Sequence, residues 1–305
     1  MALSVIHTTI ESLLVVFYIF VLFIIISSKA KTLKNAFYTL FVATGIADLI
    51  SLCACCFIRV NRELGLGEEF RFIMRWCLIL SGAGAFAHFI GNLLITFNRY
   101  SNICLLNKYE LIWTRKNIFV IVIVQYIISF AAFFHIFKAE MIYIRNEDGT
   151  VTYNGYEKSF DIISTCTYFG GCLIYATVSA YFNVRILVKW KRWSKNGRSL
   201  QHRHEDKGLM IYTMLVSSCT LLMCAQMIIR SVATFADMKA LKFWISMQYF
   251  WINDVMVSIP PFFLALLSSD LRKEMVDCIR CYKLQNLLRI FATRPNRRRS
   301  VVGKF

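Results

Sequence analysis

Two aspartates stand inside long apolar stretches and could do chemistry that their neighbours cannot. Asp48 lies within Gly-Ile-Ala-Asp-Leu, and Asp254 lies within Ile-Asn-Asp-Val-Met. A charge in an apolar environment is costly unless it is paired, so such groups are candidates for function. Two interpretations remain open. Each aspartate is protonated and hydrogen-bonds to a neighbouring helix, or both share one polar cluster that holds water or a cation and differs between two conformations.

A polar stripe follows helical spacing in the third apolar stretch. His88, Asn92 and Arg99 stand at positions i, i+4 and i+11, which places them on one face of a helix. Such a face is expected to point into a helix bundle rather than towards lipid. His88 is then either a buried, hydrogen-bonded histidine or a ligand contact.

The sequence carries neither H-E-x-x-H nor G-x-S-x-G, the motifs of two large enzyme classes. Its eleven cysteines include one C-x-x-C pair, Cys278 and Cys281, which has no partner histidines at zinc-site spacing. We therefore expect no enzyme, no cofactor and no metal site.

The elements that position these residues follow from composition. Of the 305 residues, 57% are hydrophobic and 17% are charged, against about 45–50% and about 25% in soluble proteins. This excludes most soluble enzymes, disordered proteins and disulfide scaffolds. Seven stretches approach the ~20 apolar residues that a membrane helix needs, and they are continuous rather than alternating. They cover residues 12–28, 36–58, 76–97, 117–137, 162–188, 208–229 and 243–267.

The net charge of +17 is distributed unevenly over the loops. One set of loops holds 25 of the 35 Lys and Arg residues, namely 29–35, 98–116, 185–207 and the tail 268–305. The positive-inside rule places this set in the cytoplasm and the N-terminus outside the cell. We expect an all-α protein of the plasma membrane, with a seven-helix transmembrane domain over 1–267 and a basic cytoplasmic tail over 268–305. Because the basic runs flank spans, they favour contact with membrane lipids or a protein partner over nucleic acid.

The tail itself predicts an amphipathic eighth helix over about 269–283, capped by Ser269 or Asp270. Its apolar face would lie on the inner leaflet and comprises Leu271, Met275, Cys278, Ile279 and Tyr282. Cys278 and Cys281 are then either palmitoylation sites or free cytosolic thiols.

The third stretch ends in Asn98-Arg99-Tyr100, and the seventh contains Pro260-Pro261, which predicts a kink or a strong local break in that helix. The chain here resembles rhodopsin-like receptors, whose third helix ends in an acidic-Arg-Tyr triplet. That resemblance implies that Arg99 holds the inactive state and then meets a heterotrimeric G protein. Asn98 departs from the triplet because it cannot ionise. The prolines are similar in position, though not in letters, to the Asn-Pro-x-x-Tyr element. The alternative is a static kink without a role in activation.

The same resemblance implies a disulfide from the top of the third helix to the second outer loop. Cys77 stands at that helix top, but residues 138–161 contain no cysteine, so its implied partner is Cys166.

Two longer runs narrow the resemblance: NAFYTLFVATGIADL, and NRYSNICLLNKYELIWTRKN around the end of the third stretch. They look like nematode serpentine chemoreceptors of the superfamily with classes gamma, v, u and x, and most like class v. The resemblance implies a G-protein-coupled receptor for environmental small molecules on a sensory neuron or cilium.

Such a ligand would bind in the outer half of the bundle. Trp and Tyr residues near span ends more often belong to the aromatic belt at the membrane interface, and this alternative applies to Trp244 in particular. The candidate contacts are Ser81, His88, Tyr168, Tyr175, Gln226, Trp244, Gln248 and Trp251.

The alternative function is a transporter or ion channel in which Asp48, His88 and Asp254 relay ions. The halves of the chain show no internal repeat, which counts against many transporter folds. Whether the protein dimerises is not predicted from the sequence.

Overall fold

The computed structural model describes residues 2–145, 149–195 and 203–292. At 2–5, 193–195, 203–207, 239, 243 and 281–292 only the backbone is described. Within these residues, seven helices are long and apolar enough to cross a membrane, which confirms the predicted seven-helix architecture. They are α1 (Ala2–Ser27), α2 (Ala36–Leu64), α3 (Arg71–Cys104), α5 (Arg115–Phe133), α6 (Lys158–Lys195), α7 (Arg203–Phe235) and α8 (Lys239–Leu267).

The helices extend beyond the predicted spans, chiefly at one end of the bundle. Helix α1 begins at Ala2 instead of residue 12, and α2 continues to Leu64 instead of residue 58. The prediction ended these spans at charged residues, Glu11 and Arg59. In the structure the two form a buried ion pair between α1 and α2, so their charges are compensated and both helices continue through them.

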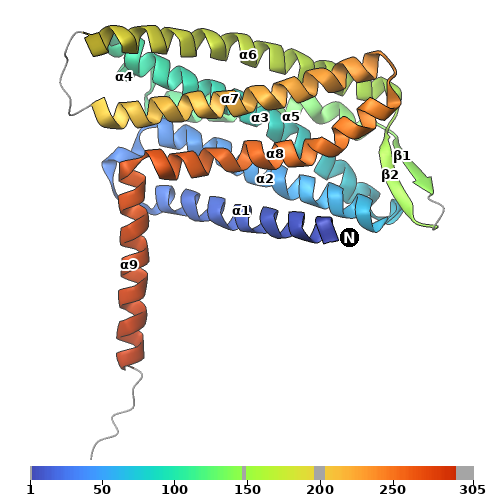
Figure 1. Cartoon of the computed structure of the whole chain (residues 1–305), viewed down its shortest axis with the longest axis horizontal. Helices are drawn as coiled ribbons and strands as arrows, with labels where there is room; N and C mark the ends of the chain where they lie inside the picture. Colours follow the sequence, from blue (N-terminus) through green and yellow to red (C-terminus); the bar gives the residue numbers. More distant parts are fainter. Residues whose placement is uncertain (1, 146–148, 196–202, 293–305) are drawn as a thin grey trace, which may run out of the picture.

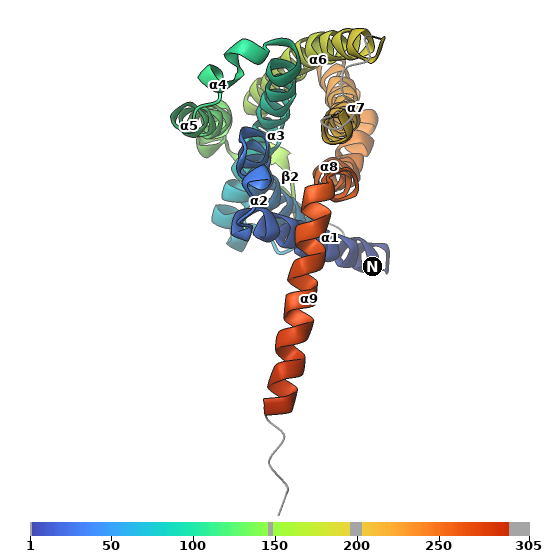
Figure 2. The same ribbon diagram turned by 90° about the vertical axis from the view of Figure 1, so that its left-hand side faces the viewer.

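Helix α3 lies at the centre of the bundle and packs on α2, α5, α6 and α7 (Figure 2). Its closest neighbour is α2, and Gly84 shows why. A Cβ atom at this position would lie 2.5 Å from the Ser51 Cβ and 3.1 Å from the Ala47 carbonyl oxygen. Small residues allow this close approach of helix backbones, as is common between membrane helices.

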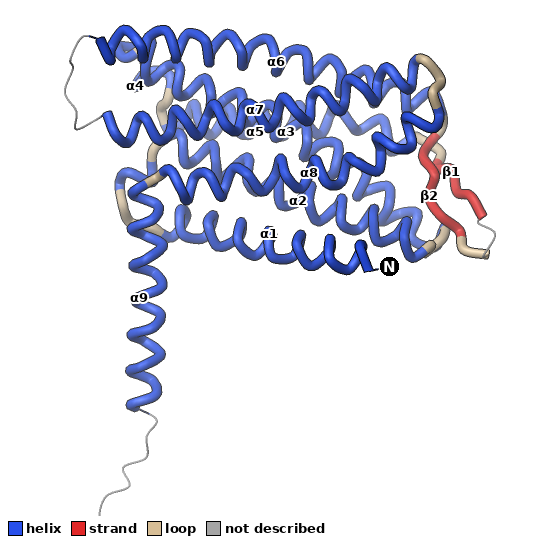
Figure 3. Tube along the Cα trace, in the orientation of Figure 1, coloured by secondary structure: helices blue, strands red, loops and turns tan. Residues whose placement is uncertain are grey.

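A β-hairpin covers one end of the bundle, which we call the hairpin end (Figures 1 and 3). Strands β1 (Met141–Arg145) and β2 (Val151–Tyr156) pair antiparallel, so the prediction of an all-α protein missed this element. A left-handed Gly65 ends α2, and the Gly67 amide then donates to the Val151 carbonyl at 3.1 Å. This contact anchors the hairpin to α2.

Helix α9 (Ser269–Ala292) leaves the opposite end, the tail end, and runs roughly perpendicular to the bundle axis (Figure 1). It is longer than the predicted 269–283. Its cap is Ser268, whose Oγ accepts the Leu271 amide at 3.2 Å and lies 2.8 Å from the Tyr38 hydroxyl; the predicted caps were the next two residues. Leu271, Met275 and Cys278 pack towards the bundle core.

A full break at Pro260-Pro261 does not occur, because α8 remains helical through both prolines to Leu267. A kink at this point stays a prediction. Each proline lacks the amide that would bond four residues back. The carbonyls of Met256 and Val257 therefore lose these partners without ending the helix.

Short elements connect the spans: η1 (Lys31–Lys34), η2 (Glu68–Phe70), η3 (Leu106–Lys108), α4 (Tyr109–Ile112) and η4 (Phe134–Lys138). At the tail end, the Trp113 indole nitrogen donates to Ser101 Oγ at 2.6 Å. This bond ties the segment after α4 to the last turn of α3.

Candidate functional site

A cavity of about 490 Å³ lies at the hairpin end, and we call it the hairpin-end cavity. Its size falls in the range of small-molecule pockets, about 300–1,000 Å³. Helices α2, α3, α5, α6, α7 and α8 contribute to its walls together with η4, and β2 supplies four consecutive lining residues. The lining is Ile58, Arg62, Leu78, Ser81, Gly82, Phe133, Ile136, Tyr153, Asn154, Gly155, Tyr156, Asp161, Tyr168, Arg230, Lys242, Ser246, Tyr249 and Phe250.

Aromatic rings form much of the wall. The rings of Phe133 and Tyr168 pack with centroids 4.8 Å apart. On the hairpin, burial raises the pKa of Tyr153 well above its ordinary value and raises the pKa of Tyr156 as well. Both phenols are therefore neutral at physiological pH and offer apolar faces and hydroxyl groups rather than charge.

Charged groups line the same cavity. Asp161 forms an ion pair with Lys242, and its other carboxylate oxygen lies 3.7 Å from an Arg230 nitrogen. Arg62 adds a third basic group against this single acid, so the lining has a formal charge of +2. The buried Nε of Arg230 has no hydrogen-bond partner among the described residues. The cavity therefore favours an anion.

The floor of the cavity is a small hydrogen-bonded cluster between α2, α3 and α8. Ser81 Oγ lies 3.0 Å from Cys55 Sγ and 3.4 Å from the Tyr249 hydroxyl. A ligand that contacts Ser81 or Tyr249 would thus affect three helices together.

Two of the eight predicted ligand contacts, Ser81 and Tyr168, line this cavity, and the other six do not. Trp244 is 58% exposed, as the interfacial-belt interpretation expects. Trp251 stacks on His7, and Gln226 Nε2 donates to the Ile245 carbonyl at 3.1 Å. Tyr175 is in the core, Gln248 is half-buried away from the lining, and His88 belongs to a deeper network.

The sequence reasoning missed Arg62, Asp161, Arg230, Lys242 and Tyr249. It used the charges at span ends only to assign orientation. It also read the segment with the hairpin as a loop, although Asp148-Gly149 between two β-branched and aromatic runs is a hairpin signal.

The central network surrounds Asp48 in the bundle interior. His88 Nδ1 lies 2.8 Å from Asp48 Oδ1, and the Tyr18 hydroxyl donates to Oδ2 at 3.0 Å. Asn92 Nδ2 donates to His88 Nε2 at 2.6 Å, which places the ring hydrogen on Nδ1 facing Asp48. Thr220 of α7 lies 3.3 Å from Asn92 Nδ2. The network thus joins α1, α2, α3 and α7.

Asp254 does not share this network, so the interpretation of one common cluster is wrong. It lies instead against His7 and Glu11 of α1, with Arg59 of α2 beside them. Helix α1 contributes to both surroundings, through Tyr18 at Asp48 and through His7 at Asp254.

Arg99 is buried at the tail end, with its guanidinium carbon 4.2 Å from the centroid of the Phe37 ring. This cation–π contact joins α3 to α2. Asn98 Nδ2 donates to the Tyr109 hydroxyl at 3.2 Å, and Tyr100 stacks on Phe182 at 4.9 Å. The triplet therefore binds α3 to three neighbouring elements, and the neutral Asn98 is used for a hydrogen bond.

The disulfide implied by the resemblance is not formed in the structure. Cys77 and Cys166 are both free thiols. Cys77 lines a shallow hollow together with Cys53 and Phe57 of α2, while Cys166 is exposed on α6. On the tail helix, Cys278 is a half-buried free thiol, and the side chain of Cys281 lies outside the described residues.

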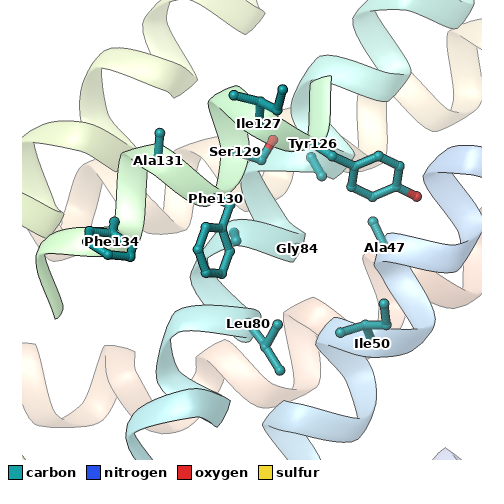
Figure 4. A pocket seen from close by; sticks show the side chains of 12 residues that line it. Ala47, Ile50, Leu80, Gly84, Tyr126, Ile127, Ser129, Phe130, Ala131 and Phe134 are labelled. Carbon is teal, nitrogen blue, oxygen red and sulfur yellow. The ribbon is translucent and has the colours of Figure 1, made fainter. Parts of the chain in front are cut away.

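A second hollow of about 680 Å³ lies between α2, α3 and α5. Figure 4 shows its wall of apolar side chains, with Phe130 of α5 and Phe134 of η4 on one side and Leu80 of α3 and Ile50 of α2 on the other. Ile127, Phe134 and Ile50 are exposed. This hollow therefore faces the lipid side of the bundle.

The seven apolar helices and the buried interhelical networks define an integral membrane protein of the seven-helix receptor type. The profile of the serpentine type 7TM GPCR chemoreceptor Srv matches residues 7–281. The chain belongs to this family, which confirms the predicted nematode serpentine chemoreceptor and class v. A comparison with curated proteins finds no match.

Proposed function

We propose that the chain is a chemosensory receptor of the plasma membrane whose hairpin end faces outside and which activates a heterotrimeric G protein at its tail end. The proposal includes the extracellular N-terminus and a site of action on a sensory neuron or cilium. The charge distribution supports the orientation, since 25 of the 35 basic residues belong to the loops and tail assigned to the cytoplasm.

The ligand we propose is a small organic anion, such as a carboxylic acid, with an apolar body. The observation that carries this proposal is the hairpin-end cavity, whose lining combines aromatic rings with three basic groups and one acid. Arg230 would donate from its unpartnered Nε to the carboxylate. The rings of Tyr168, Tyr249 and Phe250 would cover the apolar part.

Helix α3 would carry the signal along its length. It holds Ser81 at the cavity, His88 and Asn92 in the central network and Arg99 at the tail end. A ligand that binds better when α3 and α7 are displaced would shift the receptor towards that state. Arg99 would then leave Phe37 and become available to the G protein.

The ligand part is tested in cells that express the receptor with a G-protein activation reporter. A panel of aliphatic and aromatic carboxylic acids is compared with the matching methyl esters and amines. We expect acids alone to activate, and Arg230→Gln to raise the half-activating concentration about 10–100-fold, because a charged hydrogen bond contributes about 1.5–3 kcal/mol. Arg145→Gln, on an exposed hairpin arginine, is the control. Equal activation by esters and amines would contradict this ligand class.

The coupling part is tested with Arg99→Ala. We expect surface expression and unchanged acid binding, because Arg99 lies at the tail end and does not line the hairpin-end cavity, but loss of G-protein activation. Full signalling by this variant would remove the proposed role of Arg99. An ion flux through purified receptor in liposomes that Asp48→Asn abolishes would instead support the transporter alternative.

A further inference from the structure

A buried polar cluster joins α1, α2 and α8, and we call it the α1–α8 cluster. It comprises His7 and Glu11 of α1, Arg59 of α2 and Asp254 of α8, all at least nine-tenths buried. His7 Nε2 lies 2.5 Å from Asp254 Oδ2 and 3.8 Å from Glu11 Oε1. The hairpin-end cavity and the central network use none of these residues.

Three of these side chains present donor atoms that suit a metal ion. His7 and Glu11 stand one helical turn apart, and Asp254 faces them from α8, with the three donor atoms within 4.8 Å of one another. Tetrahedral zinc has bonds of about 2.0–2.2 Å, which places its donors about 3.4 Å apart. The 3.8 Å between His7 Nε2 and Glu11 Oε1 is close to this value. His7 Nε2 and Asp254 Oδ2, now 2.5 Å apart, would have to move about 1 Å further apart to bind the same ion.

Two buried oxygens in the cluster have no hydrogen-bond partner among the described residues. Glu11 Oε1 and Asp254 Oδ1 accept no hydrogen bond from any described residue. An unsatisfied buried acceptor is uncommon and requires an explanation, of which an ion that is not part of the chain is one. With both carboxyl groups ionised and His7 neutral, the cluster including Arg59 has a formal charge of −1, which a bound cation would compensate.

The surroundings hold the three ligands in place. Arg59 donates to Glu11 Oε2, so the second oxygen remains on the side of His7. The Trp251 ring stacks on the His7 ring at 3.8 Å between centroids and 6° between planes. Such outer contacts orient metal ligands. Glu63, 3.9 Å from Arg59, has a side chain 40% exposed and connects the cluster to the surface.

We propose that the α1–α8 cluster binds one Zn²⁺ ion through His7 Nε2, a Glu11 oxygen and an Asp254 oxygen, with water in a fourth position. An imidazole ligand favours zinc over calcium or magnesium, which bind oxygen ligands. The hydrogen between His7 and Asp254 leaves to solvent as the metal binds, because metal ligands are deprotonated. This differs from the expectation of no metal site from the sequence.

The bound ion would fix α1 against α8. Because α8 also supplies Lys242, Tyr249 and Phe250 to the hairpin-end cavity, zinc would stabilise one arrangement of the cavity wall. Metal binding itself can be measured without a receptor ligand, so its outcome is independent of the proposed function.

The test uses the purified full-length chain in detergent under reducing conditions. His202 and His204 of the third inner loop are replaced by glutamine throughout, so that they do not contribute. The chain is titrated with Co²⁺, whose absorption spectrum separates nitrogen and oxygen ligands from thiolates. We expect one Co²⁺ with a nitrogen–oxygen spectrum, displaced by Zn²⁺.

The variants locate the site. His7→Gln and Asp254→Asn should each weaken Co²⁺ affinity at least tenfold. Arg59→Gln should weaken it by about 10–100-fold, as is usual for an outer contact. His135→Gln is the matched control, because this histidine bonds to Ser164 at 2.8 Å at the hairpin end.

Equal Co²⁺ affinity of His7→Gln and the parent chain would overturn the proposal, as would a thiolate spectrum. If a variant does not fold, measurements on the parent chain alone still test the proposal. A Zn²⁺-dependent rise of its unfolding temperature together with the nitrogen–oxygen spectrum supports the site, and no rise overturns it.

Discussion

The two buried aspartates, Asp48 and Asp254, stand in clusters that differ in how fully their hydrogen bonds are made. Both oxygens of Asp48 have partners, His88 and Tyr18, and the side chains around them come from four helices. Asp254 has a partner on one oxygen, while the other has none among the described residues. A second carboxylate, Glu11, lies beside it.

This difference separates a structural connector from a candidate binding site. A satisfied polar network inside a low-dielectric bundle specifies how its helices pack. A cluster with two carboxylates and unsatisfied oxygens is instead poorly compensated without a further cation. The two aspartates look alike in the sequence, and their surroundings give them different roles.

The largest effect in this comparison is expected from Asp48→Ala. The substitution leaves His88 Nδ1 and the Tyr18 hydroxyl buried without acceptors. Each unpaired donor costs about 1–3 kcal/mol, so the total loss of folding stability is about 2–6 kcal/mol. Thermal unfolding of the purified chain measures it, and Ile46→Ala on the exposed side of α2 is the control. An Asp48→Ala chain as stable as Ile46→Ala would show that the network does not hold the bundle together.

The sequence predicted the architecture and the interior stripe well. Seven apolar runs gave seven helices, and the spacing of His88, Asn92 and Arg99 placed them on a buried face, as the structure has them. These features follow from composition and periodicity, which are local. The partner of each buried group is a matter of tertiary packing, so neither the Asp48–His88 pair nor the separate surroundings of Asp254 were predicted.

The candidate site was predicted less well than the fold. Ser81 and Tyr168 were found because they stand in the outer half of spans, but a cavity also depends on which helix ends meet and on what covers them. Arg230 of α7 and Lys242 of α8 converge on Asp161 near the start of α6. Assigning charged residues to loops along the sequence does not show which of them meet in the folded chain.

A smaller effect is expected from removing one hydroxyl from the central network. Tyr18→Phe leaves Asp48 Oδ2 without its donor and should cost about 1–3 kcal/mol. Tyr212→Phe is the matched control, because Tyr212 is also fully buried and its hydroxyl has no partner among the described residues. The difference in unfolding temperature between the two variants measures the Tyr18 bond. Equal unfolding temperatures would mean that Asp48 is held by His88 alone.

The smallest effect is expected from Asp254→Asn, measured in the presence of a metal chelator. The amide oxygen can still accept from His7, the oxygen without a partner becomes a donor group, and the repulsion from Glu11 is relieved. The stability should therefore remain within about 1 kcal/mol of the parent chain, because one hydrogen bond contributes about that much. Asp48→Asn is the matched substitution and should cost more, since an amide group there must oppose either the Tyr18 hydroxyl or the His88 ring hydrogen. Thermal unfolding of both variants side by side decides the matter. If Asp254→Asn destabilises the chain as much as Asp48→Asn does, Asp254 is a structural connector as well, and the contrast between the two clusters does not hold.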